Sequence, residues 1–247
     1  MSRVFFASRF EEPNFLIIEN SEDVFHLSRV LRFNKEDSLE VVYNSKIFCT
    51  VIKDIRENRI VCEIEEEKKD NRESNVEIFL CQSLPKRESW EIILEKATEL
   101  GVFGFFPLQT ERTIVNLYKA DITKKVERWK KIVKEAVEQC GRNKIPKVYE
   151  PLGLEDVIDI AKSEDAEILV AWEKANLNFK QVIKEGIKDR IFLFIGPEGS
   201  FSDKEIEILK EAGGKLFNMG PRILKVETAA IVALALLLHE KGGLGLL

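Results

Sequence analysis

The sequence predicts an α/β protein with a mostly parallel sheet covered by helices on both faces, preceded by a small β-rich unit. From about residue 75 onward, short and almost continuously apolar runs alternate with runs of helical period, which is typical of such a sheet. Residues 38–65 instead contain three β-branched or aromatic runs. The charged run at residues 65–75 has no apolar period and predicts a boundary. We therefore expect one domain over residues 1–70 and a second over residues 71–247.

The first unit is expected to begin with a helix and to continue with strands. The segment SEDVFHLSRVLRF predicts a helix with Ser21 as its N-cap. The runs SLEVVYN, KIFCTVIKDI and RIVCEIEE predict strands, and NSK and REN separate them at hairpin spacing.

The second unit alternates predicted strands and helices. The predicted strands are NVEIFLCQSL, VFGFFPLQ, EILVAW, RIFLFI and KLFNMG. The predicted helices are ESWEIILEKATEL, KKVERWKKIVKEAVEQC, LEDVIDIAK, NFKQVIKEG, SDKEIEILKEAG and VETAAIVALALLLHEK. Gly101 and Gly141 are expected to end the first two helices. Trp90 and Trp129 lie on these helices and are expected in the core.

The composition limits the partners of the protein. The net charge of −5 argues mildly against nucleic acid, so RNA would have to be bound by local basic clusters. The longest apolar run, residues 229–238, is too short to cross a bilayer, and the first residues carry no secretory signal. We expect a cytoplasmic protein with no membrane partner. No metal site is expected, because the cysteines and histidines are widely separated: Cys49, Cys62, Cys81, Cys140, His26 and His239.

Two Gly-Pro loops follow predicted strands. In FLFIGPEGSFSDKEIEIL, Ser202 and Glu205 form a capping box, so residues 196–201 connect a strand to a helix that begins near residue 203. NMGPRILKVETA repeats the pattern after the next strand. Ligands of parallel sheets bind at these strand ends. The loops are neither a Walker loop nor a GxGxxG loop, and Glu198 disfavours a phosphate ligand. They are either two tight turns or two walls of a pocket for a neutral or cationic ligand.

Together these loops resemble the paired signature of the RsmE family. The segments similar to those of the family are IGPEGSFSDKEIEIL and MGPRILKVETAAIVAL, with LPKRESWEIILEKATELGVFGFFPLQTERT and RWKKIVKEAVEQCGRNKIP before them. Members of this family are SPOUT-class methyltransferases that modify N3 of one uridine in 16S ribosomal RNA. The resemblance implies this activity, S-adenosylmethionine as cofactor, 16S rRNA or the small ribosomal subunit as substrate, and a homodimer.

The resemblance also implies a fold and a cofactor site. It implies a SPOUT-type α/β knot, a deep trefoil knot in a mostly parallel sheet, preceded by a small PUA-like β-barrel that helps to grip RNA. The knot would use three loops, at residues 171–173, 194–199 and 218–224. The implied cofactor-binding residues are Trp172, Glu173, Phe194, Ile195, Gly196, Pro197, Gly199, Met219, Gly220, Ile223 and Leu224.

Charged residues near these loops are candidates for catalysis. Uracil N3–H is a weak acid, so the reaction needs a base or a cation that stabilises the anion. Glu198 or Glu227 is the candidate base, and Arg222 or Arg142 the candidate stabiliser. The candidate RNA contacts are Arg29, Arg32, Lys86, Arg87, Arg142 and Lys144.

Three alternatives remain open from the sequence. One is another SPOUT reaction, on a ribose 2′-hydroxyl or a tRNA base. A second is a non-catalytic RNA-binding assembly factor with the same fold. The third, a nucleotide-dependent oxidoreductase, is disfavoured by the missing GxGxxG motif. The chain also departs from the family where a second glycine is usual, because it has Ser200 there, and serine restricts the turn slightly.

Overall fold

The computed structural model describes residues 3–69, 72–113 and 119–244, and these form two compact units. The first unit combines Met1–Glu73 with Val137–Ile145, and the second combines Ser74–Ala136 with Pro146–Leu247. The first unit therefore includes a segment, CGRNKI and the residues before it, that lies far along the chain from the rest of it. The charged run at residues 65–75 is partly a strand, since β6 continues to Lys68.

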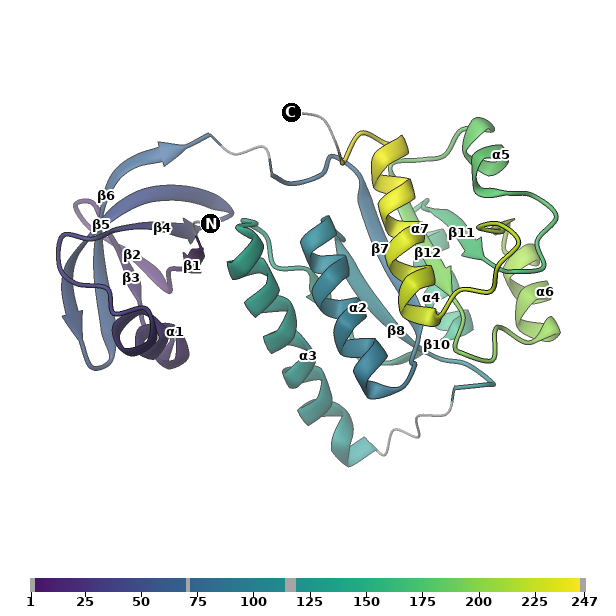
Figure 1. Cartoon of the computed structure of the whole chain (residues 1–247), viewed down its shortest axis with the longest axis horizontal. Coiled ribbons are helices and arrows are strands. Elements are labelled where there is room, and N and C mark those ends of the chain that lie inside the picture. Colours follow the sequence, from purple (N-terminus) through teal and green to yellow (C-terminus); the bar gives the residue numbers. More distant parts are fainter. Residues whose placement is uncertain (1–2, 70–71, 114–118, 245–247) are drawn as a thin grey trace. The chain divides into compact units, whose positions relative to one another are not determined.

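The first unit contains a six-stranded sheet in the order β1-β4-β5-β6-β3-β2, which is strongly curved in Figure 1. Three strands are those predicted: β4 (Ser38–Tyr43), β5 (Lys46–Arg56) and β6 (Arg59–Lys68). Three short ones were not predicted: β1 (Val4–Phe6), β2 (Arg9–Glu11) and β3 (Phe15–Ile18). β1 pairs with β4 in parallel, and the other pairs are antiparallel. The sheet and the first helix enclose an apolar cluster that includes Leu16, Val41 and Ile52.

The predicted N-terminal helix is shorter and less regular than expected. The α-helix α1 covers Ser21–Phe25 and continues as a π-helical turn, η1, over His26–Val30. The prediction of Ser21 as N-cap is wrong, because Asn20 has the extended backbone and its side chain accepts hydrogen bonds from Glu22 N and Asp23 N. An asparagine oxygen satisfies these backbone donors as well as a serine oxygen does.

The second unit contains a parallel sheet in the order β10-β8-β7-β12-β11-β13, with β9 paired to β8, so this prediction is confirmed. The strands are β7 (Glu77–Ser83), β8 (Gly104–Gln109), β9 (Lys147–Val148), β10 (Leu152–Gly153), β11 (Glu167–Ala171), β12 (Arg190–Ile195) and β13 (Lys215–Phe217). Helices cover both faces, as predicted.

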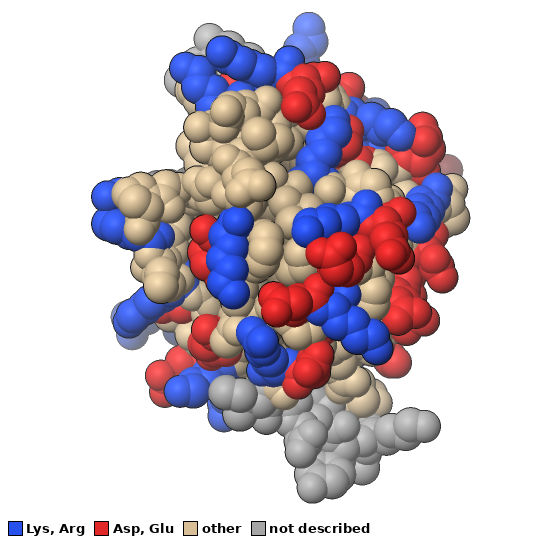
Figure 2. Space-filling model, turned by 90° about the vertical axis from the view of Figure 1, so that its right-hand side faces the viewer, with Lys and Arg blue, Asp and Glu red and all other residues tan. Residues whose placement is uncertain are grey.

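One apolar cluster lies beneath α2 (Arg87–Leu100), α3 (Lys119–Cys140) and α7 (Val226–Glu240), and it also takes in α5 (Phe179–Lys184). The other lies beneath α4 (Leu154–Ser163) and α6 (Asp203–Glu211). In Figure 1, α2, α3 and α7 lie in front of the sheet. Figure 2 views the side of the second unit that carries α5 and α6, where acidic and basic side chains are interspersed. Trp90 and Trp129 are 2% and 6% exposed, as expected for core residues.

A carboxylate joins α2 to α3. Glu91 on α2 accepts hydrogen bonds from Arg128 Nε at 2.8 Å and Arg128 Nη2 at 3.0 Å, and from Arg87 Nε at 2.9 Å. Below these ion pairs the Trp90 and Trp129 rings pack edge to face, with centroids 5.6 Å apart. The guanidinium of Arg128, followed by that of Arg87, lowers the pKa of Glu91 to about 2.

Replacing Glu91 by glutamine is expected to lower the free energy of unfolding by about 1 kcal/mol at neutral pH. The value is modest because both arginines are at least half exposed and solvent screens the pairs. The folded pKa lies below the ordinary value of about 4.3, so the contribution is complete above that value and is lost as pH falls through about 2. Urea unfolding of both proteins between pH 7 and pH 2 measures it. Glu95→Gln, on the same helix, serves as the control, and a difference that persists unchanged at pH 2 would contradict this role.

Candidate functional site

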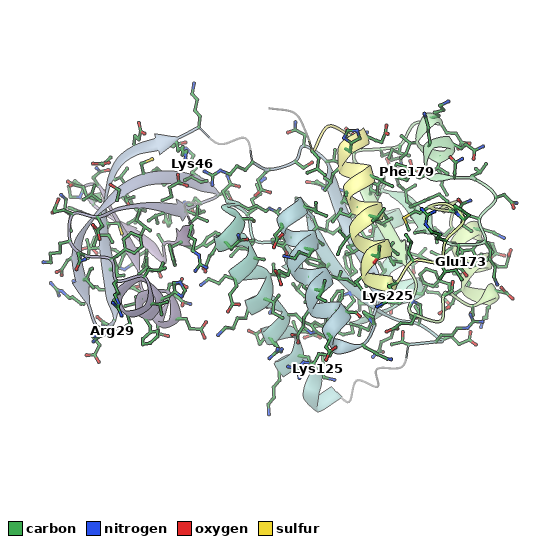
Figure 3. The ribbon with its side chains drawn as sticks, viewed as in Figure 1. Arg29, Lys46, Lys125, Glu173, Phe179 and Lys225 are labelled. Atoms are coloured by element: carbon green, nitrogen blue, oxygen red, sulfur yellow. The ribbon has the colours of Figure 1, made fainter. Side chains whose placement is uncertain are left out.

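Three loops meet in a pocket at the carboxyl ends of β11, β12 and β13. The pocket has a volume of about 270 Å³. The loop after β11, the GPEGS loop after β12 and the NMGPRIL loop after β13 all contribute to it. Figure 3 labels Glu173 in the first of these loops and Lys225, where the third loop reaches α7. The lining residues are Ala171, Trp172, Glu173, Ile195, Gly196, Pro197, Glu198, Gly199, Ser200, Met219, Gly220, Arg222, Ile223, Leu224, Val226 and Ala229.

The two Gly-Pro loops need their glycines for different reasons. At Gly196 a Cβ atom would lie 3.0 Å from the backbone nitrogen of Phe201, so a side chain would push the loop apart. Gly220 has φ of 101°, a left-handed conformation that other residues rarely adopt. The loop that contains Gly196 leads into α6, where the Ser202–Glu205 capping box is present as predicted. Both glycines therefore allow backbone to lie directly along the pocket.

A buried glutamine supports the floor of the pocket. Gln82, near the end of β7, is fully buried, and its side-chain Nε2 donates to the carbonyl oxygens of Gly196 at 3.2 Å and Ile195 at 3.4 Å. Its Oε1 has no hydrogen-bond partner in the described part of the chain. Gln82 was not predicted from the sequence, although a polar residue near the end of an apolar strand often has a buried hydrogen-bond partner.

The loop after β8 holds the GPEGS loop from another side. Arg112 Nη1 donates to the carbonyl oxygen of Gly199 at 2.8 Å. Glu205 of the capping box is 7% exposed, and its Oε1 also accepts from Glu111 N at 2.8 Å. Arg112 was not predicted from the sequence, because a single arginine in the loop after a strand has no pattern of its own. These contacts fix the loop conformation before any ligand binds.

Asn218 joins the first and third loops of the pocket. Its side-chain Nδ2 donates to the carbonyl oxygens of Ala175 at 2.7 Å and Leu177 at 3.1 Å. Its Oδ1 accepts from Gly220 N at 3.1 Å. The backbone of Trp172 also donates to Phe217 O at 2.9 Å. The segment after β13 is therefore held tightly against the loop after β11.

Ser200 adopts the left-handed conformation that a glycine would favour, with φ of 61°. Such a conformation costs a residue with a side chain about 1–2 kcal/mol. In return the Ser200 hydroxyl donates to Glu173 Oε2 at 2.9 Å. This hydrogen bond joins the first and second loops across the pocket, so the serine supplies a contact that a glycine could not.

Two charged residues at the pocket differ in how they are held. Arg222 is exposed, and among the described residues it makes no hydrogen bond or ion pair. Glu198 is also exposed, but its Oε1 accepts from the backbone nitrogen of Lys86 at 3.1 Å, at the start of α2. Glu227 lies in the first turn of α7 and is not among the residues that line the pocket. A free cation and an anchored carboxylate therefore lie at one opening.

The structure does not bring two predicted site residues to the pocket. Phe194 is fully buried in the cluster beneath α4 and α6, because side chains alternate along β12 and Ile195, like Ile191 and Leu193, faces the opposite cluster. Arg142 belongs to the first unit and is 5% exposed. Its Nη2 donates to Glu73 Oε2 at 2.7 Å and its Nε to Glu73 Oε1 at 3.1 Å. Within the first unit Arg142 therefore forms a buried ion pair with Glu73, and its catalytic and RNA-binding role stays a prediction.

The other candidate RNA contacts are exposed. Arg29 lies in η1, where Figure 3 labels it, and Arg32 follows with a left-handed backbone. Lys86 and Arg87 lie at the start of α2. Lys144 is exposed, although its backbone nitrogen donates to Glu73. All five side chains are accessible in the chain as described.

The site has the composition of a pocket for a small organic ligand. The glycine loops present backbone, and the side walls are aliphatic at Ile195, Met219 and Leu224. No group of three or more metal-ligating side chains lies together in the described ranges. Within the same ranges no helix is long and apolar enough to cross a membrane.

Comparisons with known proteins identify the class. The family model described as an RNA methyltransferase domain matches residues 72–238, which covers the whole pocket. Relatives named ribosomal RNA small subunit methyltransferase E match almost the whole chain. The relative from Bacillus subtilis is 31% identical, covering 93% of this chain and 91% of that protein. The relative from Aquifex aeolicus is 32% identical, covering 95% and 98%.

A solved structure agrees with these matches. The methyltransferase E of Neisseria gonorrhoeae, bound to S-adenosyl methionine, has a TM-score of 0.87 and 27% identity, covering 97% of this chain and 98% of that one. The fold and the pocket thus define an RNA methyltransferase. More narrowly, the chain belongs to the ribosomal RNA small subunit methyltransferase E family, so the resemblance to the RsmE family is confirmed.

Proposed function

We propose that this protein transfers a methyl group from S-adenosylmethionine to N3 of one uridine in 16S ribosomal RNA of the small subunit. The proposal rests on one observation: in a chain of this family, three loops at strand ends together form a pocket. A pocket at the carboxyl ends of parallel strands is where such a sheet binds its ligands.

The residues present fit S-adenosylmethionine. Ile195, Met219 and Leu224 give apolar walls for the adenine ring, and the glycines leave backbone groups within reach of polar atoms. Glu173 and Glu198 complement the positive charge of a sulfonium. When bound, this cofactor supplies an electrophilic methyl group. Trp172, Pro197, Gly199, Gly220 and Ile223 also line the pocket and remain proposed contacts.

The catalytic work of the chain is to position the uracil and to stabilise its anion. Holding the base beside the cofactor replaces an encounter in solution with a fixed geometry. Arg222 is the stabiliser, because its guanidinium is free at the opening of the pocket and can donate to the oxygens that gain charge. Glu198 is the better placed base, since it lines the pocket whereas Glu227 does not. Its hydrogen bond from Lys86 N holds the carboxylate in place.

Ser200→Gly is expected to weaken S-adenosylmethionine binding by about 3- to 10-fold while leaving the melting temperature nearly unchanged. The glycine relieves the left-handed backbone but loses the hydrogen bond to Glu173, which is worth about 1 kcal/mol. Ser200→Ala keeps the strain and loses the bond, so it is expected to be the less stable of the two. Calorimetric titration with the cofactor and thermal unfolding measure both. Tighter cofactor binding by Ser200→Gly would contradict the role of this bond.

Several larger features are part of the same proposal. The hydrogen bonds of Asn218 support a trefoil knot, in which the chain after β13 passes inside the loop after β11. The curved sheet of the first unit would be the PUA-like barrel, with residues 1–70 as the RNA-gripping domain and 71–247 as the methyltransferase domain. A homodimer through α7 and the knot would cover Ile223, which is 88% exposed. The place of action would be the cytoplasm.

Mass spectrometry of ribosomal RNA from cells that lack this protein tests the function. We expect one N3-methyluridine of 16S rRNA to disappear and to return when the gene is restored. Loss of a 2′-O-methylated ribose or of a tRNA methyl group would instead favour another SPOUT reaction. Absence of cofactor binding in calorimetry, with unchanged RNA methylation, would favour a non-catalytic assembly factor.

A further inference from the structure

A second pocket lies in the same unit, between the first turns of α2 and the amino-terminal half of α3. Its volume is about 370 Å³, within the range of roughly 300–1,000 Å³ that is usual for small-molecule sites. The lining residues are Leu84, Pro85, Arg87, Trp90, Glu91, Lys124, Lys125, Arg128 and Trp129. None of them lines the first pocket.

This α2–α3 pocket is strongly positive in a chain of negative net charge. Arg87, Lys124, Lys125 and Arg128 line it, against the single carboxylate of Glu91. Glu91 bridges the two arginines and so holds their guanidinium groups on either side of itself. Lys124 and Lys125 make no ion pair with any residue that the structure describes. The face with α5 and α6, by contrast, carries both signs interspersed (Figure 2).

The walls beneath this charge are apolar. Leu84 and Pro85 form one side, and Trp90 and Trp129 the other. Both tryptophans are largely buried, so they give the pocket a rigid aromatic edge and floor. An apolar cavity beneath a ring of cations matches a ligand that has a flat ring and an adjoining anion. A nucleotide has this chemistry, with its base for the cavity and its phosphate for the cations.

The position of the pocket indicates that such a nucleotide would belong to the RNA strand that enters the first pocket. The start of α2 lies between the two pockets, since Lys86 N donates to Glu198 of the first pocket while the next residue, Arg87, lines the second. Figure 3 places Lys125 beside this end of α2. An RNA strand whose target base enters the first pocket would therefore continue past the second within a short length of chain.

We propose that the α2–α3 pocket binds a nucleotide of the substrate RNA strand near the methylated uridine. Arg87, Arg128, Lys124 and Lys125 would contact the two phosphates that flank this nucleotide in the strand, and the base would enter the apolar cavity. This assignment rests on the proposed function and adds to it a second contact that sets the register of the strand. RNA binding is thereby assigned to residues on α3 as well as to the start of α2.

The test compares two double variants. Lys124→Ala/Lys125→Ala removes two cations of the pocket, and Lys130→Ala/Lys162→Ala removes two exposed lysines of helices in the same unit that do not line it. The probe is a fluorescein-labelled single-stranded RNA of about 12 nucleotides, followed by anisotropy from low to high salt. We expect the first variant to bind about tenfold more weakly at low salt, with a salt slope smaller by about 1.4, since each phosphate contact contributes about 0.7. The second variant should keep the wild-type affinity and slope.

Tryptophan fluorescence reports on the cavity itself. The chain has three tryptophans, and Trp172 belongs to the first pocket. In a Trp172→Phe protein the two that remain both line the α2–α3 pocket. RNA is expected to quench their emission, and Lys124→Ala/Lys125→Ala on this background should shift the quenching to about tenfold higher RNA concentration.

Equal salt slopes for the two double variants, or unchanged emission of the Trp172→Phe protein at saturating RNA, would overturn the assignment. The function itself has separate readouts, namely cofactor binding and methylation of small subunits by the wild type. If the wild type methylates and the pocket variants match the controls, only the second pocket is misassigned. If the wild type neither binds the cofactor nor methylates, the proposed function fails whatever the slopes show.

Discussion

Replacing Arg222 by alanine is expected to lower the rate of methyl transfer at least about 100-fold while the affinity for S-adenosylmethionine changes less than about threefold. The side chain is exposed, lines the pocket opening and makes no hydrogen bond or ion pair with other described residues, so its removal is expected to leave the loops intact. Removing one donor from a developing negative charge costs about 100- to 1,000-fold in other enzymes. Single-turnover assays on small subunits and calorimetry with the cofactor measure the two quantities.

Arg222→Lys is the matched control for this experiment. Lysine keeps the charge but loses the planar fork of donors, so we expect partial activity between the alanine variant and the wild type. A rise of the rate with pH in the alanine variant would show that the cation favours the uracil anion. Near-normal turnover by Arg222→Ala would remove Arg222 from the catalytic site, and loss of cofactor binding would make it a structural residue instead.

Replacing Arg142 by alanine is expected to destabilise the first unit by about 3–5 kcal/mol. The side chains of Arg142 and Glu73 are 6% and 15% exposed, and breaking a buried pair leaves an uncompensated charge. Glu73 also accepts from the backbone nitrogens of Asn143 and Lys144, so the pair holds the returning segment in place. Hydrogen exchange over residues 3–69, with urea unfolding, measures the loss.

Two further variants separate this structural role from a catalytic one. Lys144→Ala removes a neighbouring exposed cation and is expected to leave stability unchanged. Arg142→Met with Glu73→Leu removes both charges and is expected to recover most of the lost stability, because an apolar pair avoids the buried charge. An Arg142→Ala protein that keeps its stability but loses methylation would instead support the predicted role of Arg142 in the reaction.

Much of the second unit could be predicted from the sequence because local signals there agree with the tertiary structure. The capping box at Ser202 and Glu205 begins α6 at Asp203, and the glycine after Leu100 ends α2 in a left-handed conformation. The two Gly-Pro loops follow β12 and β13 and do form one pocket. These predictions rest on glycine, proline and capping residues, whose conformational preferences are strong enough to predict each loop from its own sequence.

The features that could not be predicted from the sequence have a common physical cause. They depend on contacts between residues that lie far apart along the chain. Phe194 belongs to the correct segment, but the face on which its side chain lies is set by the strand pairing. Arg142 follows a helix in a basic turn, and only its distant partner Glu73 makes it a buried residue. Gln82 supports the pocket from the end of β7 and Arg112 from the loop after β8, both far from β12 in the sequence. The first three strands are too short to show an alternating pattern.

The discontinuous first unit also has a consequence for how the protein is made. Its last segment, Val137–Ile145, is separated from Met1–Glu73 by more than sixty residues that belong to the second unit. During translation the carboxylate of Glu73 is synthesised long before Arg142 is available to pair with it. The first unit therefore cannot be completed before residues 74–136 of the second unit have been synthesised, and a nascent chain that stops before Ile145 carries an amino-terminal unit that is still incomplete.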